Sequence, residues 1–155
     1  MRVYEAKLDA ALAERLIALS EDWVAENSCY GYRKNTREDL ADRRIFLAED
    51  EDGILGYLFG LTEQTEKSSS ILKAGARYFE LEELYVIPAR RSEGIGKQLF
   101  ALAEESARAA GLQQIQLSTA TKAWKSILHF YLDELGMEFW SARLFKRLEN
   151  GGKEE

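Results

Sequence analysis

The chain has 155 residues, 46% of them apolar, and carries a formal net charge of -6. That length suits one globular domain, and the negative charge disfavours nonspecific nucleic-acid binding, which depends on clustered Lys and Arg. A single cysteine, Cys29, excludes an intrachain disulfide and a Cys-based metal site, and no apolar run is long enough to cross a membrane. We therefore expect a cytoplasmic protein that binds neither a membrane nor a metal ion. Its expected partner is a small cationic molecule or peptide.

Apolar periodicity predicts strands and helices along the N-terminal half. Residues that recur three and four apart mark amphipathic helices, whereas alternation every two residues marks half-buried strands. Asp9 stands where the N-cap of a helix is expected, and Thr36 with Asp39 resembles a capping box. The expected elements are strand 3–6, helix 9–23, loop 26–34, helix 36–43 and the hairpin strands 45–48 and 54–59.

The C-terminal half continues this mixed order. Pro88 stops a long strand, and Gly111 is placed to end a helix. The order predicts an α/β fold of the α+β kind, with a largely antiparallel sheet of about six or seven strands and about four helices. The expected parts are loop 62–76, strand 78–87, helix 94–110, strand 115–117, helix 123–135 and closing strands 138–140 and 142–148, in one domain 1–148 with a polar tail 149–155.

A glycine-containing turn joins the strand ending at Pro88 to the following helix. The first amides of a helix have no intrahelical partner and lie at the positive end of its dipole, so they suit an anion. Gly94 and Gly96 have no side chain to keep phosphate oxygens from the main chain. By itself this spacing is equally typical of a structural turn.

The stretch from Val86 to Leu99 resembles motif A of the GNAT N-acetyltransferases. That motif reads Gln or Arg, any two residues, Gly, any residue, then Gly or Ala, and Arg91, Gly94 and Gly96 stand at those positions. The resemblance implies that acetyl-CoA is the co-substrate and that the turn binds its pyrophosphate. The residues so implied are Arg90, Arg91, Ser92, Glu93, Gly94, Ile95, Gly96 and Lys97.

The resemblance implies further contacts with acetyl-CoA. The main chain of Leu84, Tyr85 and Val86 would pair with the pantetheine arm as an added strand. In the family a bulge in this strand separates it from the next one, and the sequence itself does not show such a bulge. Trp124 stands near the position where the family carries an Asn on the last helix.

Three glutamates on the long strand are candidate general bases. An alkylammonium has a pKa of about 10.4, so the site must remove a proton before the amine can attack. Strand alternation places Glu80 and Glu82 on one face with Leu84 and Val86, and Glu83 on the other. The family often carries the base two and four residues before the position of Leu84, which favours Glu80 and Glu82. Glu83 remains a candidate because a bulge would reverse the parity, and ion-paired surface acids are the alternative.

Tyr131 is the candidate general acid for the thiolate leaving group. Its surroundings are similar to the second motif of the family, Tyr-x-x-Leu-Gly, with one extra residue between Tyr131 and Leu135. A core tyrosine bonded to the backbone is the alternative. Tyr30 and Tyr32, in loop 26–34, are expected to shape the acceptor pocket.

The predicted function is transfer of an acetyl group from acetyl-CoA to a primary amine of a small molecule or peptide, by direct attack in a ternary complex. A noncatalytic acyl-CoA-binding module of the same fold is the alternative, because the second motif departs from the family. Exposed closing strands are expected to permit a homodimer.

Overall fold

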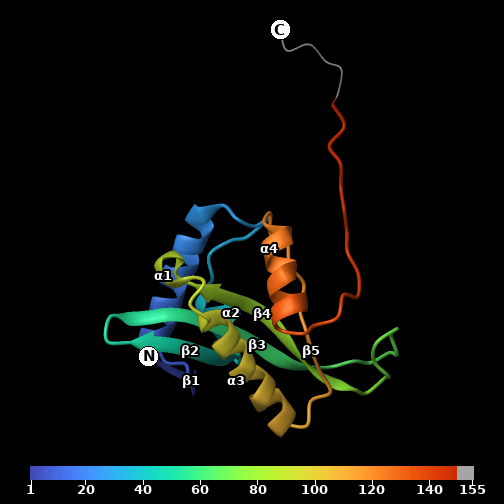
Figure 1. Cartoon of the computed structure of the whole chain (residues 1–155). Coiled ribbons are helices and arrows are strands. Elements are labelled where there is room, and N and C mark those ends of the chain that lie inside the picture. The colour runs from blue at the N-terminus through green and yellow to red at the C-terminus, as the bar shows by residue number, and fades with distance from the viewer. Residues whose placement is uncertain (150–155) are drawn as a thin grey trace.

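A computed structural model describes residues 1–149 as one five-stranded sheet with helices on both faces. The strands follow one another in chain order across the sheet (Figure 1), and the first four are antiparallel while the last runs parallel to its neighbour. The predicted mixed α/β class is confirmed, but the predicted six or seven strands are too many. The strands are β1 (Arg2–Ala6), β2 (Arg44–Asp50), β3 (Gly53–Gln64), β4 (Arg77–Val86) and β5 (Gln114–Gln116).

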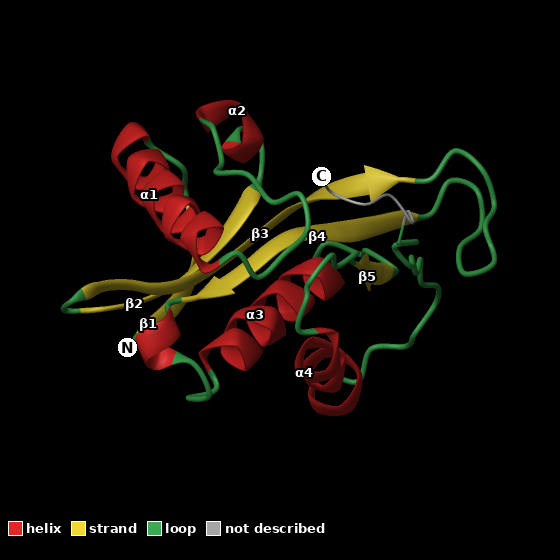
Figure 2. Ribbon diagram, turned by 90° about the horizontal axis from the view of Figure 1, so that it is seen from above, coloured by secondary structure: helices red, strands yellow, loops and turns green. Residues whose placement is uncertain are grey.

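The helices lie on both sides of the sheet, as Figure 2 shows. The first two helices begin at the predicted caps: Asp9 accepts the amide of Leu12, and Thr36 and Asp39 form the capping box in both directions. The helices are α1 (Ala10–Glu26) and α2 (Arg37–Leu40) on one face and α3 (Ile95–Ala109) and α4 (Trp124–Leu128) on the other, with a 3-10 turn at Pro88–Arg90 and a π-helical turn at His129–Glu134.

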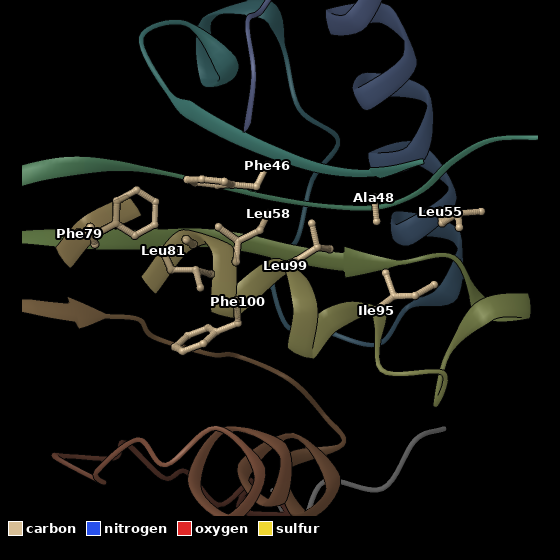
Figure 3. Close-up of a cluster of buried hydrophobic side chains, with 11 residues drawn as sticks. Phe46, Ala48, Leu55, Leu58, Phe79, Leu81, Ile95, Leu99 and Phe100 are labelled. Carbon is tan, nitrogen blue, oxygen red and sulfur yellow. The ribbon is translucent and has the colours of Figure 1, made fainter. Parts of the chain in front are cut away.

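An apolar cluster lies on each side of the sheet. On the α3 side, Phe46, Leu58 and Phe79 pack against Leu99 and Phe100 (Figure 3). Burying one such side chain contributes about 1.5–3 kcal/mol, so the cluster fixes α3, and the turn before it, against the sheet. On the α1 side, the buried residues include Leu16, Leu40, Tyr57, Phe59 and Tyr85.

A β-bulge at Glu82 interrupts the pairing of β3 with β4. Phe59 pairs with Glu83 and Gly60 pairs with Leu81, which leaves Glu82 without an opposite residue. Gly60 permits this arrangement because a Cβ at that position would collide with the backbone of β4. The bulge therefore lies in the strand that carries the candidate bases.

The bulge changes which residues of β4 share a face. Leu81 and Leu84 both pack against the α3-side cluster, whereas Tyr85 belongs to the α1-side cluster. Alternation from Leu81 then places Glu80 on the α1 side, opposite Leu84. The prediction that Glu80 shares a face with Leu84 and Val86 is wrong, because the extra residue of the bulge reverses the parity between them.

Residues 137–149 form no strand, and beyond Met137, which packs against the α3-side cluster, the chain extends away from the sheet (Figure 1). Leu144 is 94% exposed, Trp140 donates its indole N–H to Ser70 at 2.8 Å, and the ring of Phe145 contacts Tyr30 edge-on. The predicted closing strands 138–140 and 142–148 are wrong, because alternating apolar residues give a segment strand propensity but not a partner edge. Of the predicted tail 149–155, only Glu149 lies within the described residues.

Within residues 1–149, no helix combines the length and the apolar character that crossing a membrane requires.

Candidate active site

The turn between β4 and α3 presents a row of unpaired backbone amides. The first helical bond of α3 runs from the amide of Gln98 to the carbonyl of Gly94 at 3.1 Å. Within residues 1–149, the amides of residues 92–97 find no backbone or side-chain acceptor. Gly94 caps the helix in the left-handed region with φ of 80°, which a residue without a side chain adopts at no steric cost. The geometry creates an anion site at the positive end of α3.

The two arginines of this turn are already paired with carboxylates. Arg90 donates to Glu93 at 2.6 Å and to Asp50 at 3.0 Å. Arg91 makes a bidentate pair with Glu26, at 2.6 and 3.0 Å, and its guanidinium lies 5.4 Å from the ring centre of Tyr85. The exposed Lys97 makes no ion pair within the described part of the chain. The main chain is therefore the stronger anion-binding element here.

Gly96 also contacts the last helix. A Cβ built on Gly96 would lie 3.3 Å from the ring of Phe130 in the π-helical turn. The absence of a side chain thus lets the end of α4 approach the first turn of α3.

One edge of β4 is open beyond its contact with β5. The strand β5 pairs only with Tyr78–Glu80, so no strand of the described residues covers that edge from Leu81 onward. Ile87 donates its amide to Leu55 of β3, and alternation turns the amide and carbonyl of Val86 toward the open edge. Arg91 already donates its Nε to the carbonyl of Val86 at 2.8 Å. Leu84, two residues earlier, has the same orientation, so main-chain groups line the edge that leads to the amide row.

A cavity of about 270 Å³ lies on the α1 side of the bulge. It contains three acids and two arginines, and two of the acids form bidentate ion pairs: Arg33 with Asp39 and Arg43 with Glu82. The lining residues are Gly31, Tyr32, Arg33, Asn35, Asp39, Arg43, Phe59, Glu82 and Glu83.

Glu83 differs from the other cavity acids because only neutral donors contact it. Tyr57 and Asn35 each donate to its Oε2 at 2.9 Å, and Tyr32 donates at 3.2 Å. Burial raises the pKa of Glu83 above its usual range, and these hydrogen bonds oppose the rise. A carboxylate that is buried and has no cationic partner is suited to take up a proton.

The other two candidate bases have different surroundings. Glu82 is bound by Arg43 at 2.7 Å and lies at the cavity wall. Glu80 lies outside the cavity, where burial, together with the nearby Glu82 and Glu63, raises its pKa to about 7. All three acids lie on the α1 side, but the structure brings only Glu82 and Glu83 into the cavity.

The two loop tyrosines separate in the structure. Tyr32 packs against Trp23, with ring centres 4.4 Å apart and ring planes tilted by 40°, and lines the cavity. Tyr30 is 51% exposed and contacts Phe145 and Lys122 instead, outside the cavity lining. A β-bridge between Cys29 and Thr121 ties this loop to the segment after β5.

The extra residue near Tyr131 is absorbed by the π-helical turn His129–Glu134. There the amide of Leu135 bonds to the carbonyl of Phe130, five residues back, which accommodates one residue more than an α-helical turn. Burial raises the pKa of Tyr131 to about 12. Trp124, at the start of α4, is 57% exposed and has Lys125 over its ring.

Tyr57, Asn35 and Arg43 are not among the residues that the sequence predicts for this site. Tyr57 lies in an apolar strand and Asn35 directly precedes a helix cap, so each has a local structural explanation. The one available signal was a phenol among the core residues of β3, because buried tyrosines usually find a hydrogen-bond partner.

Known proteins resemble the chain in sequence and in fold. A model of the acetyltransferase (GNAT) family matches residues 11–137. An aminoalkylphosphonate N-acetyltransferase from Salmonella typhimurium is 47% identical over 55 residues, which is 36% of this chain and 35% of that protein. The chain thus matches about a third of the length of this curated relative.

Solved structures share the fold across nearly the whole chain. A mutant of the BH1408 protein from Bacillus halodurans superposes with a TM-score of 0.70 at 20% identity, covering 96% of this chain and 100% of the other. An aminoglycoside N-acetyltransferase in complex with CoA superposes with a TM-score of 0.64 at 15% identity, covering 96% and 100%. At these identities the likeness establishes the fold.

Proposed function

Because the chain belongs to the acetyltransferase (GNAT) family, we propose that it transfers an acetyl group from acetyl-CoA to the primary amine of a small molecule, by direct attack in a ternary complex. The observation that carries this proposal is the row of unpaired amides at residues 92–97. Acetyl-CoA supplies an activated thioester when bound. The protein must hold that donor, admit the amine and remove its proton.

The donor site fits the chemistry of CoA. The amides of residues 92–97 would bind the pyrophosphate, and the side chain of Lys97 adds a positive charge beside them. The main chain of Leu84 and Val86 would pair with the amides of the pantetheine arm, as an added strand does at an open sheet edge. The amide of Tyr85 faces β3 by alternation, so we assign the pantetheine contacts to Leu84 and Val86.

The cavity beside Glu83 is the proposed acceptor site. Its volume of about 270 Å³ lies at the low end of ligand pockets, so it admits a small amine or the amino end of a larger molecule. The curated relative is named for aminoalkylphosphonates, which join an amine to an anionic group. In this cavity Glu83 would meet the ammonium, and Arg33 and Arg43 are the cations that the anionic group would approach.

Glu83 is the proposed general base. It accepts hydrogen bonds from neutral donors, lines the proposed acceptor cavity and has a pKa raised above its usual range by burial. A raised pKa strengthens the affinity of a carboxylate for the proton that a general base must take up. Glu82 is less suited because Arg43 already binds both of its oxygens in a bidentate ion pair.

Tyr131 is proposed to assist the leaving sulfur through a hydrogen bond. A phenol with a pKa of about 12 stays protonated at neutral pH. Full transfer of its proton to a thiolate is unfavourable, because a thiol has a pKa of only about 8.5. The hydroxyl would therefore donate a hydrogen bond to the sulfur, and solvent would supply the proton.

The test combines binding and turnover. Calorimetry with CoA should detect binding, and a thiol reagent should detect CoA release when acetyl-CoA is mixed with one amine of a panel of aminoalkylphosphonates, aminoglycosides and cationic peptides. Release that depends on an amine supports the proposal. Absence of CoA binding at millimolar ligand would refute the donor site.

A noncatalytic acyl-CoA-binding module is the second candidate. The π-helical turn at Tyr131 favours it, because this turn is where the chain departs from the second motif of the family. Tight CoA binding without thiol release from any amine of the panel would select this alternative.

A further inference from the structure

All three hydrogen bonds to Glu83 end on the same oxygen. Tyr57, Asn35 and Tyr32 donate to Oε2, and Oε1 accepts no hydrogen bond within residues 1–149. Because no side-chain oxygen or nitrogen of the described residues is both buried and unpaired, Oε1 is accessible to solvent. One oxygen of Glu83, a residue that lines the cavity, is therefore anchored, while the other is accessible and unbonded within the described residues.

The anchoring donors are themselves held by the fold. Tyr57 is fully buried in β3, where burial and the nearby Glu83 raise its pKa, so that the phenol keeps its proton and donates at every physiological pH. The backbone amide of Asn35 donates to Oγ of Ser20 at 2.9 Å, and Ser20 donates to the carbonyl of Ile17 within α1. The sheet thus fixes one donor and α1 fixes the other.

Resting on the proposed function, in which Glu83 is the base, we propose that Tyr57 and Asn35 are positioning residues that bind Oε2 and so present Oε1 to the acceptor ammonium. The proton moves from the ammonium nitrogen to Oε1, which leaves a neutral amine with a free electron pair and a neutral carboxylic acid. The carboxyl proton then returns to solvent before the next cycle. The anchors serve this step because a carboxylate that is held at one oxygen cannot rotate both oxygens out of reach.

The electrostatic surroundings of Glu83 set the sign of the expected effect. Each neutral donor stabilises the charged form of Glu83, so the loss of one donor should raise its pKa further. A new negative charge beside it should raise the pKa more. The titratable groups that face it are Tyr32 and Arg33 of the loop before α2, Asp39 of α2, Arg43 after α2, Tyr57 of β3 and Glu82 of β4.

The direct test is a titration of Glu83 by carbon NMR in the full-length protein. Tyr57→Phe removes one hydrogen-bond donor to Glu83. Asn35→Asp replaces the donating amide by a negatively charged carboxylate of nearly the same shape. Tyr4→Phe is the matched control. The hydroxyl of Tyr4 donates to a carboxylate oxygen of Glu49 over 2.8 Å, and neither residue lines the cavity. We expect the Glu83 midpoint to rise by about one pH unit in Tyr57→Phe, to rise further in Asn35→Asp and to stay unchanged in the control.

Kinetics connect this titration to turnover. With acetyl-CoA and aminoethylphosphonate as substrates, the acid limb of the pH profile of kcat/KM should shift to higher pH in both variants, by as much as the Glu83 midpoint. The KM for acetyl-CoA should stay the same. A Glu83 midpoint that does not move in either variant would overturn the inference, as would an acid limb that fails to follow it.

Glu83→Gln separates this inference from the proposed function. Wild-type turnover in that variant would show that Glu83 is not the base. Loss of turnover in Glu83→Gln, with unchanged pH profiles in Tyr57→Phe and Asn35→Asp, would leave the base in place and reject only the positioning role.

Discussion

Replacing Glu80 with Gln removes a charge whose formation the fold opposes. Burial raises the pKa of this carboxyl from 4.5 to about 7, with smaller contributions from Glu82 and Glu63. Because the folded-state pKa lies above the unfolded value, ionisation of Glu80 lowers the free energy of unfolding as pH rises from about 4.5 to about 7. Below that window the neutral side chain has no such cost, and above it the full cost is present.

The magnitude follows from the size of the shift. A shift from 4.5 to about 7 corresponds to about 3 kcal/mol, since one pKa unit is about 1.4 kcal/mol. Glu80 is only half-buried, and solvent screening reduces the effect to about 1 kcal/mol. Glu80→Gln should therefore raise the free energy of unfolding by about 1 kcal/mol near pH 8 and change it little near pH 4.

Urea denaturation at the two pH values measures this difference. Glu66→Gln is the control, because it removes the same charge from an exposed loop residue. A stability gain of equal size at both pH values, or a gain of equal size in the control, would refute the assignment of the cost to the buried Glu80 carboxyl.

Three further variants test the site and the core. Gly96→Glu should abolish CoA binding in calorimetry, because its Cβ would lie 3.3 Å from Phe130 and its carboxylate would lie beside the amides of residues 92–97; retained affinity would reject the donor site. Tyr131→Phe should lower kcat by about 10²-fold or less and leave the CoA affinity unchanged, because only a hydrogen bond to the leaving sulfur is lost; unchanged kcat would remove Tyr131 from the mechanism. Leu99→Ala, at a fully buried position, should lower the free energy of unfolding by about 2–5 kcal/mol in urea denaturation; a loss below about 1 kcal/mol would mean that the α3-side cluster is loosely packed.

The sequence was sufficient to predict the helix caps and the glycine-containing turn before α3, because each depends on neighbouring residues. Asp9 and Thr36 cap helices through bonds to amides three residues away. The anion site likewise needs only a strand end, a glycine turn and the first turn of a helix, all within Val86–Leu99. Local conformation decides such features, so a short motif is sufficient to predict them.

Only the tertiary structure decided the surroundings of Glu83 and the conformation of residues 138–149. Glu83 accepts hydrogen bonds from Tyr57, which is 26 residues away in the sequence, and from Asn35, which is 48 residues away. The bulge that turns Glu83 into the cavity depends on Gly60, which lies in another strand. The closing strands are wrong for the same reason: apolar alternation in the segment 138–149 is a local feature, whereas pairing depends on a distant strand, and this segment pairs with no strand of the described residues. Alternation fixes the faces of a strand only until a bulge inserts a residue, and the position of a bulge is set by the partner strand.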